Sequence, residues 1–176
     1  MFFTTGAVRY RRSIKERTAS TMIESFTFDH TAIDVLPYVR LAKRIDLPRE
    51  GKALWKFDIR FTRPNQEFLP TEVIHTLEHI LSIELDRWAG ETGVTYVDFS
   101  PMGCQTGFYF SVIGGDAVTE RLISGAMNAV CTASLAYDAV PHANERDCGN
   151  YLHFNLPEAK RLCKDIWFQP FGTPDR

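Results

Sequence analysis

The sequence has no long apolar run, no strong excess of either charge and few cysteines, and each absence excludes a class of protein. No apolar run approaches the roughly 20 residues that a membrane-spanning helix needs, so we expect a soluble domain that does not bind membranes. The 20 Lys and Arg residues nearly balance the 22 Asp and Glu residues, which leaves no basic surface for nucleic acid. The 176 residues also lack a Pro/Gly/Ser-rich linker and an internal repeat, which excludes several large domains.

The sequence contains only four cysteines, and no two of them form a CxxC pair. A chain of this size does not need disulfide bonds for stability, and no secretory apolar stretch precedes the cysteines. We therefore expect reduced thiols in a cytoplasmic protein, where a cysteine more often binds metal or reacts. With 44% hydrophobic residues, the chain has enough apolar side chains for a globular core.

The first 21 residues differ from the rest of the chain in charge. Against the single acidic Glu16 they hold five basic residues, which are Arg9, Arg11, Arg12, Lys15 and Arg17. Because this segment shows no clear periodicity, we expect residues 1–21 to form a flexible basic extension and residues 22–176 to form a single domain. Two origins of the extension stay open: a transit peptide, or an upstream start with Met22 as the natural first residue.

Alternation of apolar and polar side chains predicts three strands. Residues 54–62 alternate most clearly, and we expect them to form a half-buried strand that ends before Pro64. Residues 95–99 and 108–113 are expected to form two further strands, joined by a loop at 100–107 that is rich in turn-forming residues.

Three helices are also expected. The first runs from Thr71, a good N-cap residue, to Trp88, with Gly90 near its C-cap. The second starts after Asp116, and the third begins around Pro157, which suits a first helical turn. Because most of the strands lack an intervening helix, the expected fold class is α+β, a single domain in which an antiparallel sheet packs against helices.

The first helix carries an HxxEH motif at His75, Glu78 and His79. At about 100° per residue, His79 lies about 40° from His75 and Glu78 about 60° to its other side, so all three leave one face. Two imidazoles spaced in this way can bind one cation, and a neighbouring carboxylate can transfer protons. The apolar stripe of this helix lies roughly opposite the histidines and consists of Val73, Leu77, Leu81, Leu85 and Trp88.

A metal bound by two imidazoles needs at least one further ligand, and the cysteines are the natural candidates. Cys131 and Cys163 have apolar neighbours at helical spacing, so we expect core thiols there. Cys104 and Cys148 each adjoin a glycine in a polar stretch. One of these two could complete the metal site while the other acts as an acid/base group or a nucleophile, and their spacing leaves both assignments open.

Two other functions are compatible with the HxxEH motif. The first is a metallopeptidase, which needs an acidic third ligand such as Glu145 or Glu158 and usually a much larger chain. The second is a non-catalytic metal-binding domain, which would use four protein ligands.

Five stretches of the sequence together resemble the S-ribosylhomocysteine lyase (LuxS) family in their order and spacing. They are residues 24–30, 56–61, 75–79, 100–107 and 148–149. The resemblance runs from about residue 23 to residue 160, and the combination of HTLEH, SPMGCQTG and a downstream Cys-Gly is highly specific. Relatives often place a histidine at the position of Phe154, and we assign no role to Phe154 or to the neighbouring His153.

The resemblance implies a role for nine residues. The implied metal ligands are His75, His79 and Cys148, with water in the fourth position. The implied acid/base groups are Cys104 and Glu78. The residues implied around the substrate are Ser25, His30, Arg60 and Asp98.

The resemblance also implies the reaction and the assembly. Members of the family cleave S-ribosylhomocysteine to homocysteine and 4,5-dihydroxy-2,3-pentanedione, the precursor of autoinducer-2, by carbonyl migration and β-elimination. The expected cofactor is one divalent metal per subunit, ferrous iron in the physiological form with zinc or cobalt able to replace it, and no organic cofactor. The expected assembly is a homodimer whose active sites lie at the subunit interface.

Overall fold

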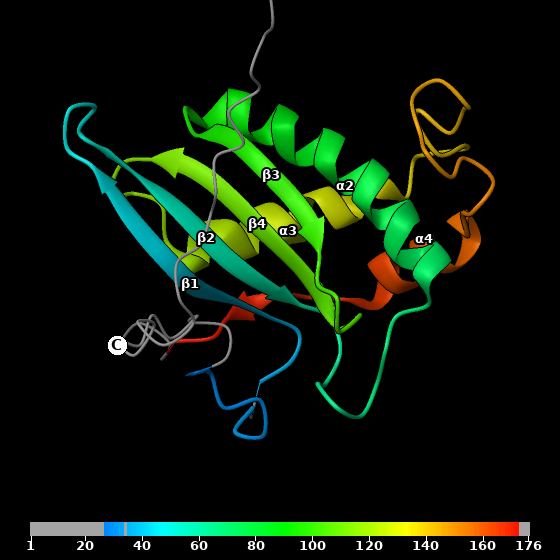
Figure 1. Ribbon diagram of the computed structural model, residues 1–176, viewed down its shortest axis with the longest axis horizontal. Helices are drawn as coiled ribbons and strands as arrows, with labels where there is room; N and C mark the ends of the chain where they lie inside the picture. Colours follow the sequence, from blue (N-terminus) through cyan, green and yellow to red (C-terminus); the bar gives the residue numbers. More distant parts are fainter. Residues whose placement is uncertain (1–26, 34, 173–176) are drawn as a thin grey trace, which may run out of the picture.

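The computed structural model describes residues 27–33 and 35–172, so the predicted extension at 1–21 and the predicted substrate contact Ser25 lie outside the described residues. The described chain forms one α+β domain (Figure 1). In chain order, with the labels of Figure 1, its elements are β1 (Tyr38–Leu47), β2 (Lys52–Arg60), α2 (Thr71–Thr92), β3 (Thr95–Pro101), β4 (Gly107–Gly114), α3 (Glu120–Ser134), α4 (Leu156–Asp165) and β5 (Gln169–Pro170).

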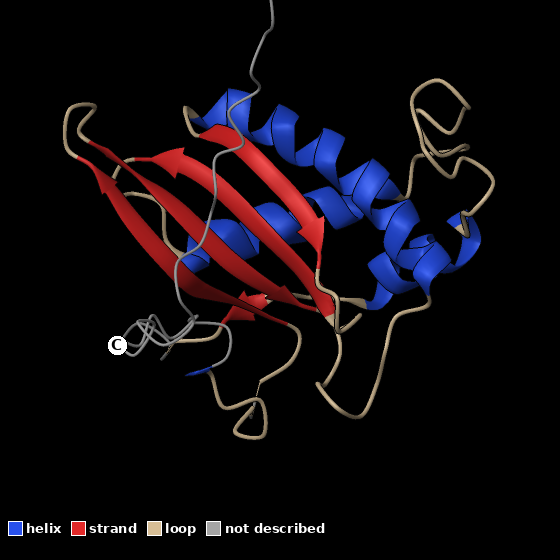
Figure 2. Cartoon of the chain, viewed as in Figure 1, coloured by secondary structure: helices blue, strands red, loops and turns tan. Residues whose placement is uncertain are grey.

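The five strands form one sheet in the order β3-β4-β2-β1-β5. The pairs β1–β2, β2–β4 and β3–β4 are antiparallel, whereas the short β5 pairs with β1 in parallel. The helices lie on one side of this sheet (Figure 2). The predicted fold class is therefore confirmed. None of the described helices combines the length and the apolar character that crossing a membrane requires.

The core lies between the sheet and the helices. Phe57 and Ile59 of β2 belong to the same buried cluster as Leu77 and Leu81 of α2 and Met127 of α3. On the helices, apolar residues at a spacing of three or four give each helix a buried stripe, and on the strands alternate residues face the core. The predicted core thiols Cys131 and Cys163 are both buried in this cluster.

The strand predicted at 54–62 is found at Lys52–Arg60. The next two residues leave the ladder, because the backbone N–H groups of Phe61 and Thr62 donate to the carbonyl oxygen of Thr106 at 3.0 and 3.2 Å. The prediction of a half-buried strand is wrong at the end of β2, since Asp58 and Arg60, which point away from the helices, are each only 2% exposed. These two charged side chains are buried together with polar partners, described below.

The strand β1 was not predicted from the alternation pattern. The register of β1 against β2 shifts between Leu41 and Lys43, which is the signature of a bulge, and a bulge interrupts the alternation of faces. The second half of the strand is also largely exposed, and even its apolar Ile45 does not face the core. The alternation that predicted the other strands is therefore interrupted in the middle of β1.

Both predicted boundaries of the first helix are corrected. The N-cap position is Pro70 and not Thr71, and no side chain caps this end. The helix continues through Gly90 to Thr92, and Gly93 forms the C-cap with a φ of 73°. A left-handed C-cap of this kind favours glycine, whereas a glycine inside a helix is tolerated at a cost.

The observed end of α2 leads to opposite predictions for Gly90 and Gly93. We expect Gly90→Ala to stabilise the protein by about 0.5–1 kcal/mol, because alanine favours a helix interior and nothing lies within 4 Å of the added Cβ. We expect Gly93→Ala to destabilise it by about 1–2 kcal/mol, because φ is positive there. Urea unfolding of both variants measures the two changes. The same sign for both would contradict the observed end of α2.

Candidate metal centre and thiol pocket

Two imidazoles and one thiol meet beside α2. The side chains are His75 and His79, one turn apart on the helix, and Cys148, from the loop between α3 and α4. One ligand atom from each lies within 4.8 Å of the others, and Cys148 Sγ is 3.3 Å from His75 Nε2. All three side chains are partly buried.

The outer hydrogen bonds of the two histidines fix their tautomers. His75 Nδ1 lies 2.9 Å from the carbonyl oxygen of His153, and His79 Nδ1 lies 2.8 Å from that of Pro141. A carbonyl oxygen can only accept, so each ring carries its proton on Nδ1 and leaves the Nε2 lone pair for a metal. Two imidazoles and a thiolate suit zinc, ferrous iron and cobalt alike. The residues present therefore fit one divalent cation.

Residues 153–155 contact His75 and the neighbouring Thr76 on α2. The Phe154 ring stacks on His75, with centroids 4.2 Å apart and planes 24° apart, and lies edge-on to His79 at 4.9 Å. The backbone N–H of Asn155 donates to the hydroxyl of Thr76 at 2.9 Å. The sequence did not predict these contacts of Phe154 and His153 with the histidines, and its only signal for them is their closeness to Cys148.

Asn144 organises the loop that carries Cys148. Its side-chain oxygen accepts the backbone N–H groups of Arg146 and Asp147, both at 3.1 Å, and its carbonyl oxygen accepts the N–H of Cys148 at 3.0 Å. The backbone N–H of Asn150 then points to Cys148 Sγ at 3.4 Å. These bonds hold the loop so that the sulfur faces the histidines.

We expect Asn144→Ala to weaken metal binding about tenfold to a hundredfold, which is the usual effect of removing a residue that orients a ligand. Competition with a chromophoric chelator measures the change in metal affinity. Asn150→Ala is the matched control, because only the backbone N–H of this exposed residue contacts the sulfur. Equal affinity of the Asn144→Ala variant and the unaltered protein would show that the loop orients Cys148 without this side chain.

Glu78 lies on the same helix face as the histidines and is half-buried. Burial raises the pKa of its carboxyl above the ordinary value, the two imidazoles act in the opposite direction, and Asp98 raises it further. Asp98, on β3, accepts a hydrogen bond from the Ser100 hydroxyl at 2.7 Å. The predicted acid/base residue Glu78 and the predicted substrate contact Asp98 thus belong to the metal side of the molecule.

A second group of predicted site residues forms a pocket of about 290 Å³. Its wall combines the end of β2, the loop that joins β3 to β4, and a residue from the segment before β1. The lining residues are His30, Asp58, Arg60, Met102, Gly103, Cys104 and Tyr109. Predicted site residues Cys104, Arg60 and His30 therefore share one pocket.

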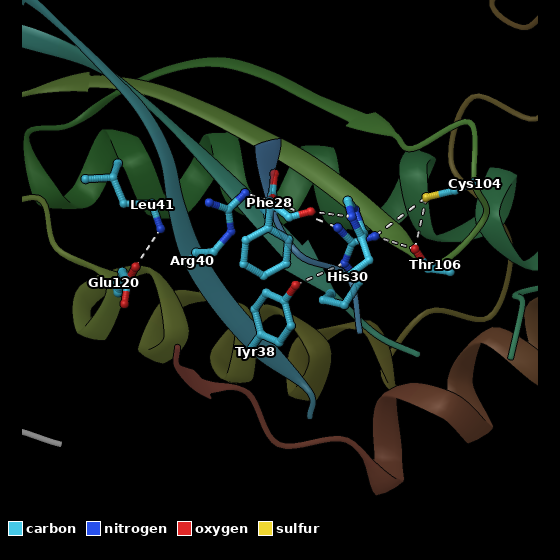
Figure 3. A network of polar contacts seen from close by, with 10 residues as sticks. Phe28, His30, Tyr38, Arg40, Leu41, Cys104, Thr106 and Glu120 are labelled. Carbon is cyan, nitrogen blue, oxygen red and sulfur yellow. Dashed lines mark hydrogen bonds and ion pairs between the residues drawn. The ribbon is translucent and has the colours of Figure 1, made fainter. Parts of the chain in front are cut away.

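The Cys104 thiol in this pocket is exposed and surrounded by donors (Figure 3). Its Sγ lies 3.0 Å from the Thr106 hydroxyl and 3.6 Å from Nη1 of Arg60. Burial alone would raise the pKa of this thiol, but hydrogen bonds from Thr106 and the charge of Arg60 outweigh it and lower the pKa below the ordinary value. A thiol of this kind is reactive near neutral pH.

Buried polar partners surround Arg60. Its Nε donates to the Tyr38 hydroxyl at 3.3 Å, and its Nη2 lies 3.9 Å from Asp58 Oδ2. Arg40 forms an ion pair with the same Asp58 oxygen, and the Arg40 guanidinium stacks over the ring of Phe28 at 4.0 Å. These contacts explain why two charged residues at the end of β2 are buried.

The two groups lie on different sides of the sheet within one chain. His75 and His79 project from α2, which covers the core face, whereas Arg60 alternates with core residues and projects from the opposite face. Among the described residues, no hydrogen bond or ion pair joins Cys104 or Arg60 to the three clustered ligands. The predicted site residues are thus brought together in two sets rather than in one.

The comparison with known protein families bears on both sets. The family model described as S-ribosylhomocysteinase (LuxS) matches residues 23–172, which is most of the chain. The match includes the three clustered ligands and every residue that lines the Cys104 pocket. The resemblance found in the sequence is confirmed, and the chain belongs to the LuxS family of S-ribosylhomocysteinases.

Proposed function

We propose that this protein is a metal-dependent lyase that cleaves S-ribosylhomocysteine to homocysteine and 4,5-dihydroxy-2,3-pentanedione. Membership of the S-ribosylhomocysteinase family implies the substrate. The observation that carries the proposal for this chain is the cluster of His75, His79 and Cys148, whose ligand atoms lie close enough together to bind one metal ion. The dione is the precursor of autoinducer-2, so the product is a candidate signal.

The chemistry of the substrate explains which groups are required. The carbon–sulfur bond at C5 breaks readily only when C4 can lose a proton next to a carbonyl at C3. The carbonyl must therefore move from C1 to C2 and then to C3, through two enolisations that involve no net oxidation or reduction of the substrate. Removal of the C4 proton then expels the homocysteine thiolate from C5. Each step needs a base near carbon and stabilisation of the charge that develops on oxygen.

The three ligands supply the charge-stabilising part of the site. A divalent cation held by His75, His79 and Cys148, ferrous iron in the physiological form or zinc or cobalt in its place, would act as a Lewis acid toward the sugar oxygen. The two backbone carbonyls behind the histidines keep both Nε2 atoms directed at that position. No organic cofactor is required for this chemistry.

We assign the proton transfers to Cys104 and Glu78. The Cys104 sulfur, with its lowered pKa, can take a proton from one carbon and return it to the next. The Glu78 carboxyl, which leaves the same helix face beside His75, can serve the protons on the sugar oxygens. His30 and Arg60 border the Cys104 pocket and Asp98 borders Glu78, so we assign these three, together with Ser25, to holding the substrate.

We further propose that the active form is a homodimer with shared sites. A reaction that uses both Cys104 and the cluster needs them around one substrate, yet a single chain carries them on different sides of its sheet. A second copy that presents its Cys104 pocket to the cluster of the first copy would complete the site. Each dimer would then hold two equivalent active sites.

The competing functions receive less support from the geometry. The third member of the cluster is a thiol, whereas an HxxEH metallopeptidase would use a carboxylate. Glu158, one of the two acidic candidates, is already bound by the guanidinium of Arg161 at 2.5 and 2.8 Å. A non-catalytic metal domain would use a fourth protein ligand, and the cluster in the described part of the chain contains three residues.

The decisive experiment measures thiol release from S-ribosylhomocysteine, with and without a chelator, alongside metal analysis of the same sample. We expect homocysteine release that the chelator abolishes and added ferrous iron, zinc or cobalt restores. A protein that binds one metal per subunit and releases no thiol would be a non-catalytic metal domain. Release that is unaffected by complete metal removal would remove the cluster from the mechanism.

A further inference from the structure

The Thr106 side chain contacts both the Cys104 thiol and the Arg60 guanidinium in the Cys104 pocket (Figure 3). Its hydroxyl oxygen is 3.0 Å from Cys104 Sγ and also accepts a hydrogen bond from Nη1 of Arg60. The residue is 1% exposed, so water does not compete for these bonds. Every polar contact of this hydroxyl is therefore with the protein.

The direction of these hydrogen bonds follows from proton counting. A guanidinium group has only donors, so the Thr106 oxygen must be the acceptor in its bond with Arg60. The hydroxyl has a single proton, and that proton is then free to point at Cys104 Sγ. The sulfur also faces Nη1 of Arg60 at 3.6 Å, so it is the acceptor at the end of a chain that starts at Arg60.

The backbone prevents Thr106 from turning away. Its carbonyl oxygen accepts the N–H groups of Phe61 and Thr62, which follow directly after Arg60. The next residue, Gly107, pairs with Arg60 in the sheet, and a Cβ on Gly107 would lie 2.0 Å from the carbonyl oxygen of Ile59. This close approach of β4 to β2 sets the position of the hydroxyl relative to the guanidinium.

We propose that Thr106 is a positioning residue whose hydroxyl, oriented by Arg60, donates to Cys104 and holds the sulfur as a thiolate pointing into the pocket. The proposal rests on the proposed function only for the role of Cys104 in proton transfer. The other charged or titratable groups around the thiol are Asp58 beside Arg60 on β2, Tyr38 on β1, Tyr109 on β4 and His30 before β1.

The test uses the metal-loaded protein and measures the rate of Cys104 alkylation by iodoacetamide as a function of pH, followed at that residue by peptide mass spectrometry. Thr106→Val keeps the shape of the side chain and removes the donor, so the alkylation midpoint moves to higher pH. At a pH below both midpoints, a higher midpoint means a smaller fraction of thiolate, so we expect alkylation to slow about threefold to tenfold per unit of midpoint shift. The lower figure applies because a more basic thiolate is a better nucleophile, which offsets part of the loss. Thr106→Ser restores the donor and the original midpoint.

The controls separate positioning from folding. Thr132→Val removes a hydroxyl that binds the backbone of α3, away from the pocket, and leaves the midpoint unchanged. If Thr106→Val does not fold, Thr106→Ala carries the same expectation. The proposal is wrong if Thr106→Val leaves the alkylation midpoint unchanged. It is also wrong if Thr106→Ser shifts the midpoint as far as Thr106→Val does. Alkylation does not require turnover, so thiol release from S-ribosylhomocysteine by the same samples reports on the proposed function separately.

Discussion

The Cys104→Ala variant is expected to lose turnover of S-ribosylhomocysteine by about 10²–10⁴-fold while it keeps its metal, because one acid/base group typically contributes that much. The Cys148→Ala variant is expected to lose both the metal and the activity, since its sulfur is one of only three clustered ligand atoms in the described chain. Thiol release and metal content per subunit, measured on the same samples, distinguish the two results.

Each variant serves as the control for the other, because both remove one sulfur atom from the protein. A metal-free Cys104→Ala protein together with a metal-loaded Cys148→Ala protein would reverse the two assignments. Equal loss of metal in both variants would mean that the two sulfurs bind the same ion. That outcome would contradict the assignment of Cys104 as an acid/base group.

A coexpressed mixture of these two inactive variants is expected to recover about a quarter of the unaltered activity, and the purified mixed dimers about half. In a mixed dimer, one shared site combines the intact Cys104 of one subunit with the intact cluster of the other, while the second site carries both substitutions. Random pairing makes half of the dimers mixed, and each has one working site. Coexpression with different affinity tags followed by thiol-release assays measures the recovery.

The matched control for this experiment pairs Cys148→Ala with His79→Ala. Both substitutions damage the cluster, so every site in the mixed dimer lacks a metal ligand and no activity returns. Recovery in the first mixture but not in the control would support a site built from two subunits. If both mixtures are inactive although the mixed dimers form, Cys104 and the cluster act within one chain, and the shared site is wrong.

Local patterns in the sequence predicted the elements that bury one face. The stripe from Val73 to Leu85 lies in the core, and the alternating residues of β2, β3 and β4 form adjacent strands. The strand β1 was missed because its bulge breaks the alternation, and β5, at two residues, is too short to carry a pattern. The end of α2 was placed at the wrong glycine, since only the backbone angle distinguishes Gly93 from Gly90.

The candidate site was predictable where its residues share one helix turn. His75, Glu78 and His79 lie on one face because the helix period requires it. The choice between Cys104 and Cys148 as the third member of the cluster depended on the family resemblance, because the fold brings Cys148 to α2 from far along the chain. The stacking of Phe154 on His75 had no counterpart in sequence spacing for the same reason.

The loop that carries Cys148 also affects how the protein survives a shortage of metal. Residues 136–154 contain no helix or strand and are tied to α2 by the carbonyls of Pro141 and His153, which accept from the two histidines. An ion bound between α2 and Cys148 would add a cross-link at this point and raise the free energy of unfolding with the logarithm of its concentration relative to its Kd. Protease should therefore cut metal-starved protein first within this loop, and cellular metal supply would control the lifetime of the protein as well as its activity.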